Sequence, residues 1–123
     1  MKPDIKNRND IELLVNAFYD KVIEDEKIGY LFNEVAKVNW ALHLPKMYDF
    51  WENILFFTGN YNGNPMAKHR ELHEQSSLDK SHFDQWNLLF NKSVDELFEG
   101  EKAQEIKERA MNISAVMMVK AIS

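Results

Sequence analysis

The sequence predicts an all-α protein, and two observations lead to this fold class. Apolar residues recur with the helical period along most of the chain, whereas β-branched residues do not alternate in runs as strands require. Glycine and proline number only four and three among 123 residues, and no linker, internal repeat or low-complexity tract divides the chain. A chain of this length with 45% hydrophobic residues can bury one core, so we expect one domain over residues 1–123.

The first expected helix begins at Asn9 or Asp10 and ends near Asp25. Glu12 stands three residues after Asn9, a spacing that resembles a capping box. A short connector, EKIGYLFNE, follows the helix. The apolar positions of the helix repeat at helical spacing and comprise Ile11, Leu14, Val15, Phe18 and Val22.

The next expected helix lies within residues 39–57. Pro45 conflicts with a start at Asn39, because a proline in a helix interior costs about 3 kcal/mol. Either the helix begins close to Pro45 or its first turn is irregular. Its broad apolar face comprises Met47, Phe50, Trp51, Ile54 and Leu55.

The stretch TGNYNGNP, residues 58–65, predicts a loop, because glycine, asparagine and proline dominate it. Asn64 suits the N-cap and Pro65 the first turn of a short helix that would contain Met66, His69, Leu72 and His73. A further helix opens at Asp79 or Ser81, and the last one follows Gly100. Their apolar stripes are Phe83, Trp86, Phe90, Val94 and Leu97, then Ile106, Ala110, Ile113 and Met117. Five or six helices with unequal loops suit a globin-like arrangement of crossing helices better than a regular four-helix bundle, although periodicity does not decide between them.

Composition narrows the possible functions. The net charge of −5 argues against nucleic acid and anionic membrane surfaces as partners. No apolar run approaches the roughly 18 residues of a spanning helix, and the first ten residues lack the apolar core of a secretory signal. Without cysteine there is no disulfide, no thiolate metal site and no covalent c-type haem. A cytoplasmic protein is expected, and the eight Phe, four Tyr and three Trp leave a surplus that could bind a flat apolar ligand.

His69 and His73 stand one helical turn apart, a spacing that can chelate zinc. The zinc-protease pattern H-E-x-x-H is not met, because the sequence reads HRELH and offers no third ligand nearby. His73 fits an exposed position. His69 lies at the apolar edge of its helix, beside Met66 and Leu72, where a neutral imidazole could either face solvent or serve as an axial ligand of iron.

Three further polar or aromatic residues share apolar helix faces. His43 precedes Met47 by one turn, so it is either a core histidine or a pocket group. Tyr19 lies at the inner edge of the first helix, where its hydroxyl would need a partner. Trp86 lies on an apolar stripe, and His82 fits a surface or capping position. Taken singly, Tyr19 and Trp86 are more often core residues than site residues.

Taken together, four segments resemble the group III truncated haemoglobins, in the same order and at similar intervals. They are FYDKVIEDEKIGYLFNEV, WALHLPKMYDFW, TGNYNGNPMAKHREL and HFDQWNLLFNKSVDELF. The resemblance covers roughly residues 5–120, and the absence of a Gly-Gly pair also suits group III. It implies a truncated globin, a two-over-two helical sandwich that holds haem b (iron protoporphyrin IX) noncovalently.

The resemblance also implies roles for single residues. His69, in PMAKH, matches the proximal ligand of the haem iron. On the distal side, His43, Tyr19 and Trp86 match the residues that hold a bound ligand. Five further residues match the apolar wall of the haem pocket, namely Phe18, Phe32, Met47, Phe50 and Trp51.

The resemblance leaves the propionate partner and the end of the proximal helix open. Lys46 could reach a haem propionate, with Lys68 as a second candidate. The segment RELHEQSSLDKS is longer than the resemblance predicts and lacks the proline usual after the proximal helix. This departure leaves the end of that helix open and leaves His73 as a rival to His69.

The function that the resemblance implies is binding of O2, NO, CO or peroxide at haem iron. Because two distal donors would slow the release of oxygen, redox chemistry suits the pocket better than transport. NO dioxygenase or peroxidase-like activity with an outside reductase would be such chemistry. The alternative is an all-α interaction or sensor module, either with bis-histidine haem that also uses His43 or without haem. We expect a monomer or a weak dimer.

Overall fold

The computed structural model describes residues 2–35, 37–59 and 78–122, with side chains placed up to Val119. Within these ranges the structure is helical and contains no strand. Its elements are α1 (Arg8–Glu24), a π-helical turn η1 (Leu31–Val35), α2 (Trp40–Phe56), α4 (Lys80–Leu97) and α5 (Glu101–Ile122). The predicted short helix with Lys68, His69 and His73 lies outside the described residues.

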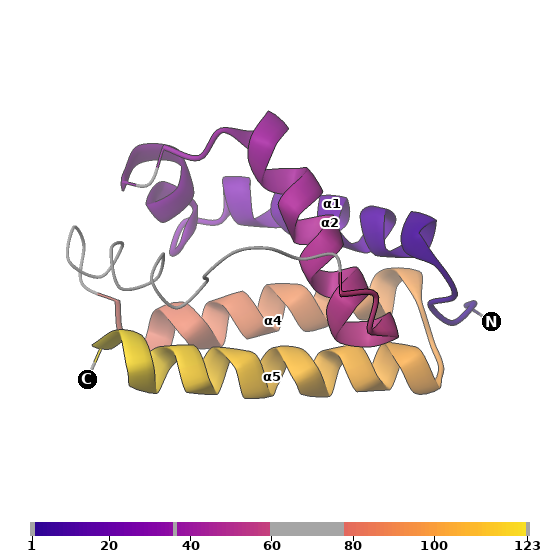
Figure 1. Ribbon diagram of the computed structural model, residues 1–123. Coiled ribbons are helices and arrows are strands. Elements are labelled where there is room, and N and C mark those ends of the chain that lie inside the picture. Colours follow the sequence, from indigo (N-terminus) through magenta and orange to yellow (C-terminus); the bar gives the residue numbers. More distant parts are fainter. Residues whose placement is uncertain (1, 36, 60–77, 123) are drawn as a thin grey trace.

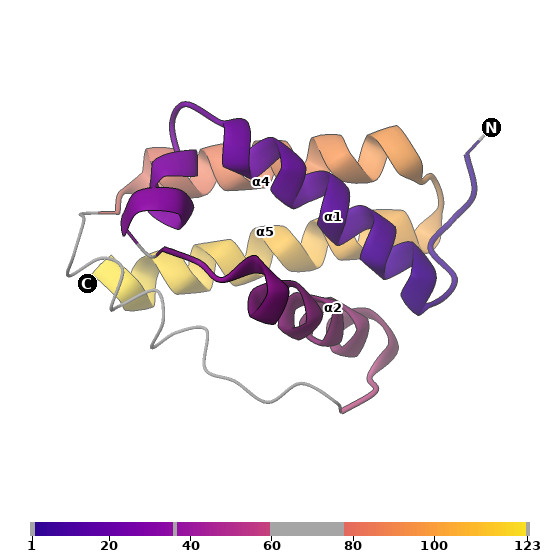
Figure 2. The ribbon, with the colours of Figure 1, turned by 90° about the horizontal axis from the view of Figure 1, so that it is seen from above.

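The four α-helices of the described ranges form two layers (Figure 1). α1 and α2 lie over α4 and α5, and the view from above shows α1 running obliquely across the layer of α4 and α5 while α2 lies beside α5 (Figure 2). α4 and α5 pack side by side, α1 packs on both α2 and α4, and α2 packs on α5. This is the two-over-two arrangement that the sequence resemblance implies. Among the described residues, no helix has the length and apolar character needed to cross a membrane.

The apolar stripes expected from the sequence meet between the layers. All five stripe residues of α1 are fully buried. Phe90 and Val94 of α4 pack with Ile106 and Ala110 of α5 in the same core. The face of α2 is divided between fully and partly buried residues: Trp51 and Leu55 are buried, whereas Met47, Phe50 and Ile54 are partly buried against the core.

The start of α1 differs from the prediction. The helix begins at Arg8, and the side chain of Asn7 accepts a hydrogen bond from the Asp10 N–H at 3.2 Å. The predicted caps, Asn9 and Asp10, are therefore helical residues, and Glu12 forms an ion pair with Arg8 at 3.2 Å instead of a capping box. Several residues in this region have capping side chains, so sequence alone did not identify the one with the required backbone angles. The predicted end near Asp25 is confirmed.

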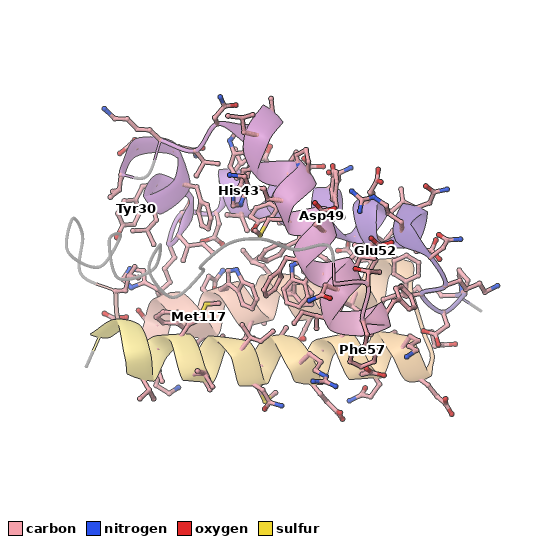
Figure 3. All side chains as sticks on the ribbon, in the orientation of Figure 1. Tyr30, His43, Asp49, Glu52, Phe57 and Met117 are labelled. Carbon is pink, nitrogen blue, oxygen red and sulfur yellow. The ribbon has the colours of Figure 1, made fainter. Side chains whose placement is uncertain are left out.

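Arg8 ties α1 to α2. One guanidinium nitrogen lies 2.7 Å from Asp49 and 3.0 Å from Glu52, and both carboxylates belong to α2 (Figure 3). The hydrogen bond to Asp49, outweighing burial, raises the pKa of Arg8 above its ordinary value, with Glu52 adding to the effect. This partly exposed cluster helps to hold the two helices that carry the candidate site, although exposed pairs of this kind contribute only about 1 kcal/mol or less.

Neither of the two alternatives left open at Pro45, a start close to the proline or an irregular first turn, is borne out. The helix begins at Trp40 and runs through Pro45, so its early turns are helical but lack the hydrogen bond that a proline cannot donate. Asn39 is the N-cap, yet its side chain makes no capping hydrogen bond. The helix ends at Phe56, and its C-cap, Phe57, adopts a left-handed conformation with φ 57°. The predicted connector after α1 contains the turn η1, which the sequence did not predict.

Asp79, one of the two candidates, caps α4. Its side chain accepts from the Ser81 N–H at 2.8 Å, and the Nδ1 atom of His82 accepts from the Asp79 N–H at 3.0 Å. These bonds form a capping box in which histidine takes the place of the usual glutamate. The capping role expected for His82 is confirmed.

The N-terminus of α5 is capped from the other end of the chain. The carboxylate of Asp4 accepts hydrogen bonds from the N–H groups of Lys102 at 2.9 Å and Ala103 at 2.8 Å. Burial alone would raise the pKa of Asp4, but these backbone donors together lower it below the ordinary value. Gly100 makes the approach possible, because a Cβ atom there would lie 2.5 Å from the Asp4 side chain and its φ is 142°.

We expect Asp4→Ala to lower the free energy of unfolding by about 1–2 kcal/mol, because two helix donors lose their acceptor. Since the folded state depresses the pKa of Asp4, this contribution is present above the pKa of the unfolded carboxyl and is lost as pH falls through the folded pKa. Urea unfolding at neutral and acid pH measures both effects. Asp20→Ala, an exposed aspartate of α1, is the matched control, and equal losses in the two variants would contradict the capping role.

Candidate functional site

The candidate site centres on Tyr19 and His43. Tyr19 lies on the inner face of α1 and is 6% exposed, and His43 lies in the first turns of α2 and is half-buried. Tyr19 Oη and His43 Nε2 share a hydrogen bond of 3.3 Å. Figure 3 shows His43 near the start of α2, in the same half of the molecule as Met117 of α5. The prediction that the Tyr19 hydroxyl needs a partner is confirmed.

Burial favours the uncharged forms of both Tyr19 and His43. It raises the pKa of the Tyr19 hydroxyl well above its ordinary value, so the phenol remains a hydrogen-bond donor at neutral pH. Burial also lowers the pKa of His43, and the positive charge of Lys46 lowers it further. A neutral imidazole has one donor and one acceptor nitrogen, so the pair can accommodate a small polar ligand without introducing charge.

The lowered pKa of His43 predicts a pH-dependent stability. The unfolded imidazole titrates near pH 6.5, so between that value and the lower folded pKa the unfolded chain binds more protons. The free energy of unfolding should therefore fall as pH drops below about 6.5, by more in the wild type than in His43→Gln. Urea unfolding of both chains without added haem, across this pH range, measures the difference, and parallel pH profiles would contradict the assignment.

An aromatic group surrounds the pair. Trp40 lies with its ring centroid 5.2 Å from that of Tyr19 and 5.6 Å from that of His43. Phe32, from η1, stacks on Trp40 at 6.1 Å and meets the ring of Tyr19 at 6.0 Å. Trp40 was not predicted as a site residue. Its position three residues before His43 is a helical spacing that places both on one face, and this signal could have identified it.

A second aromatic cluster adjoins the first through Phe18, whose ring lies 4.9 Å from that of Tyr19. Phe18 meets the edge of Trp86 at 5.4 Å. Trp86 stacks on Phe90 at 5.5 Å and on Trp51 at 6.2 Å. Trp86 is half-buried, whereas Phe18 and Trp51 are fully enclosed in the core. Among the residues predicted for the pocket wall, these two belong to the core of this structure.

The remaining predicted site residues divide into three groups. Phe32, Met47 and Phe50 are partly buried and pack against the core. Lys46 is exposed one turn after His43. His69, Lys68 and His73 lie outside the described residues, so the structure does not place the predicted proximal ligand. Among the described residues, no group of three His, Cys, Asp or Glu side chains is arranged to hold a metal ion.

The donor set suits a haem carrying a small polar ligand. A buried phenol, a neutral imidazole and an indole N–H stand among aromatic rings, and an apolar face of partly buried residues follows along α2. Such rings can cover a flat apolar group, while the phenol and imidazole are polar groups able to bond a ligand atom that carries partial negative charge.

The comparison with known families agrees with this geometry. A model of the bacterial-like globin family matches residues 4–120. The match spans nearly the whole chain, and the two-layered helical fold agrees with it. The chain therefore belongs to the bacterial-like globin family.

Individual relatives define its place in the family more closely. The chain is 31% identical to the group 3 truncated haemoglobin ctb of Campylobacter jejuni over 118 residues, which cover 94% of this chain and 91% of the relative. It is also 31% identical to the group 1 truncated haemoglobin GlbN of Synechocystis, but over only 60% of this chain and 58% of that one. The crystal structure of the group III truncated haemoglobin from Campylobacter jejuni superposes with a TM-score of 0.83 at 30% identity, covering 97% of this chain and 94% of that one. The predicted resemblance to group III and the globin fold are confirmed.

Proposed function

We propose that this protein binds haem b noncovalently and holds O2 and related diatomic ligands at the iron. Membership of the truncated haemoglobins supports globin-type ligand binding at haem. The observation that carries the proposal is the buried Tyr19–His43 pair, a polar contact within an aromatic surround. A backbone carbonyl could equally have accepted a hydrogen bond from the buried Tyr19 hydroxyl. The hydroxyl is paired with the His43 imidazole instead, and two adjacent polar side chains suit the recognition of a polar ligand.

His69 is the proposed proximal ligand, because it alone has the PMAKH context that matches the family. His73, four residues on, is the rival that a substitution must exclude. Phe18, Phe32, Met47, Phe50 and Trp51 are proposed for the apolar wall. Lys46, with Lys68 as the second candidate, is proposed to pair with a propionate.

Haem, when bound, supplies an iron atom that takes up diatomic ligands. The chain supplies the donors around that ligand. Tyr19 can donate its O–H to the outer ligand atom while its oxygen accepts a hydrogen bond from His43 Nε2–H, a chain in which each bond polarises the next. The Trp86 indole N–H is the proposed second donor. Each bond to a polarised ligand contributes about 1–3 kcal/mol, so two such bonds slow ligand release by orders of magnitude.

Slow release points to chemistry on the ligand rather than transport. We propose turnover of nitric oxide or peroxide, with a separate reductase that supplies electrons. The neutral state of His43 suits this role, because an uncharged imidazole can accept a proton near neutral pH. The site therefore favours an NO dioxygenase or peroxidase-like activity over oxygen storage.

The structure also bears on the bis-histidine alternative. The Nε2 atom of His43, through which an imidazole commonly ligates a metal, is engaged with the Tyr19 hydroxyl. Coordination would require that bond to break and leave a buried phenol in need of another partner. This arrangement favours His43 as a ligand-holding group over His43 as a second axial ligand.

Haemin titration tests the proposal. We expect the chain to bind one haemin, monitored in the Soret region, and to unfold at a higher temperature when haemin is present, because a ligand that binds only the folded state stabilises it. A chain that folds fully and gains no stability from haemin would support the alternative, an all-α interaction module. Haemin binding to an unrelated helical protein under the same conditions sets the nonspecific background.

A further inference from the structure

The first turn of α2, which carries His43, lacks a side-chain cap and one of the backbone hydrogen bonds of a regular helix. Asn39, at the N-cap, makes no side-chain hydrogen bond to the helix. Pro45 has no N–H, so the carbonyl of Ala41 receives no hydrogen bond from the position where a helix would normally supply one. The N–H of His43 donates to the Asn39 carbonyl at 2.8 Å, so the backbone of His43 is held, and the orientation of its imidazole depends on side-chain contacts.

Trp40, the first residue of α2, supplies such contacts. Its ring meets that of Tyr19 at 57° and that of His43 at 80°, at centroid distances of 5.2 and 5.6 Å. The rings of Tyr19 and His43 meet at 79°, with 5.3 Å between centroids. The three rings thus contact one another pairwise, in the tilted and edge-to-face arrangements that aromatic pairs prefer.

Trp40 is itself held from a second element. Phe32 of η1 stacks on it with an angle of 22° between the ring planes and also meets the edge of Tyr19. The group thus consists of Tyr19 from α1, Phe32 from η1, and Trp40 and His43 from α2. Trp40 contacts each of the other three rings. Removal of its indole would leave His43 with the Tyr19 ring as its remaining aromatic contact among the described residues.

The hydrogen bond within this group is long. At 3.3 Å, the separation of Tyr19 Oη and His43 Nε2 lies just beyond the usual 2.7–3.2 Å of N–H···O hydrogen bonds, so the bond alone orients the imidazole weakly. A small displacement of His43 would break it. The packing around the pair, rather than the bond itself, must keep the two groups together.

We propose that Trp40 is a positioning residue that holds His43 against Tyr19 and thereby sets how firmly the pocket retains a small polar ligand. The second part of this inference rests on the proposed function. The first part concerns only the arrangement of the chain's own side chains and is testable without haem. Lys46 and Tyr19 are the charged and titratable groups in contact with the imidazole or acting on it.

The ring nitrogen-15 chemical shifts of His43, recorded on the full chain without added haem, test the first part. They report the tautomer and whether Nε2 is hydrogen-bonded. We expect Trp40→Ala to move them toward those of a solvent-exposed imidazole and Trp40→Phe to restore most of the wild-type values. Leu42→Ala, an exposed residue of the same turn, is the control and should change nothing. Wild-type shifts in Trp40→Ala would overturn the inference, and Trp40→Leu replaces Trp40→Ala if the latter does not fold.

A double-mutant cycle on the haem-loaded protein tests the second part. We expect Trp40→Ala to raise the O2 dissociation rate about tenfold in the wild type but less than about twofold in a Tyr19→Phe background, because the effect passes through the pair. Equal increases in both backgrounds would overturn it. A chain that binds no haem would remove the proposed function, whereas the nitrogen-15 result would still decide the role of Trp40.

Discussion

Replacement of Tyr19 by phenylalanine is expected to raise the O2 dissociation rate by about ten- to a hundredfold. The substitution removes one hydroxyl and keeps the ring, whose contacts with Phe18, Trp40 and His43 lie at centroid distances of 4.9, 5.2 and 5.3 Å. A lost hydrogen bond to a polarised ligand is worth about 1–3 kcal/mol, and each 1.4 kcal/mol corresponds to a factor of ten. Stopped-flow displacement of O2 by CO measures the rate.

Tyr48→Phe is the matched control for this experiment. Tyr48 belongs to α2, and its hydroxyl donates to Asn16 at 2.5 Å in an exposed position. We expect this variant to lose a peripheral bond and to keep the wild-type dissociation rate. An unchanged rate in Tyr19→Phe, with haem bound normally, would show that Tyr19 is not a distal donor.

Phe18→Ala is expected to lower the free energy of unfolding by about 3–5 kcal/mol, the usual cost of removing a fully buried aromatic ring. Phe18 has no exposed surface and contacts Tyr19, Trp86 and Phe90 with centroid distances of 4.9, 5.4 and 5.3 Å. The loss would be a large share of the stability of a domain of this size. Urea or thermal unfolding of the chain without haem measures it.

Leu13→Ala provides the comparison on the same helix. Leu13 is 57% exposed, so its truncation should change the free energy of unfolding by about 0.5 kcal/mol or less. Phe18→Leu, which retains most of the apolar volume, should fall between the two. Similar losses for Phe18→Ala and Leu13→Ala would contradict the position of Phe18 at the junction of the two aromatic clusters.

Periodicity predicted most of the fold because burial has a regular spacing along a helix. The stripe of α1 and the central residues of α4 and α5 are buried as expected. Caps were less predictable, since Asn7, Asn9 and Asp10 all have suitable side chains and only backbone geometry selects Asn7. The cap on α5 comes from Asp4, nearly a hundred residues away, and local sequence holds no signal for such a contact.

Pro45 shows a different limit of sequence reasoning. Helix propensity disfavours a proline in the helix interior, yet the apolar face of α2 buries Trp51 and Leu55, and this packing outweighs one lost backbone bond. The missing hydrogen bond bears on the site, because His43 lies in the first turn, which lacks it.

The sequence pointed to Tyr19 and His43 singly but not to their contact. Tyr19 and His43 each stand out in the sequence as polar groups on apolar helix faces. Their mutual contact, however, depends on how α1 crosses α2. Trp40 was missed because it stands at the edge of a predicted helix whose start was uncertain. His69 was predicted from a motif that resembles the family, and it lies outside the described residues.

The absorption spectrum of the haem-loaded protein, oxidised, reduced and reduced under CO, tests the central claim most directly when wild type, His69→Ala and His73→Ala are compared. We expect a Soret band that shifts under CO in the wild type and in His73→Ala, and that is lost or altered in His69→Ala. Sharp split visible bands in the reduced state without added ligand would instead indicate a second axial residue. A wild-type chain without a Soret band, prepared with ample haem, would contradict the assignment of this globin as a ligand-binding haem protein.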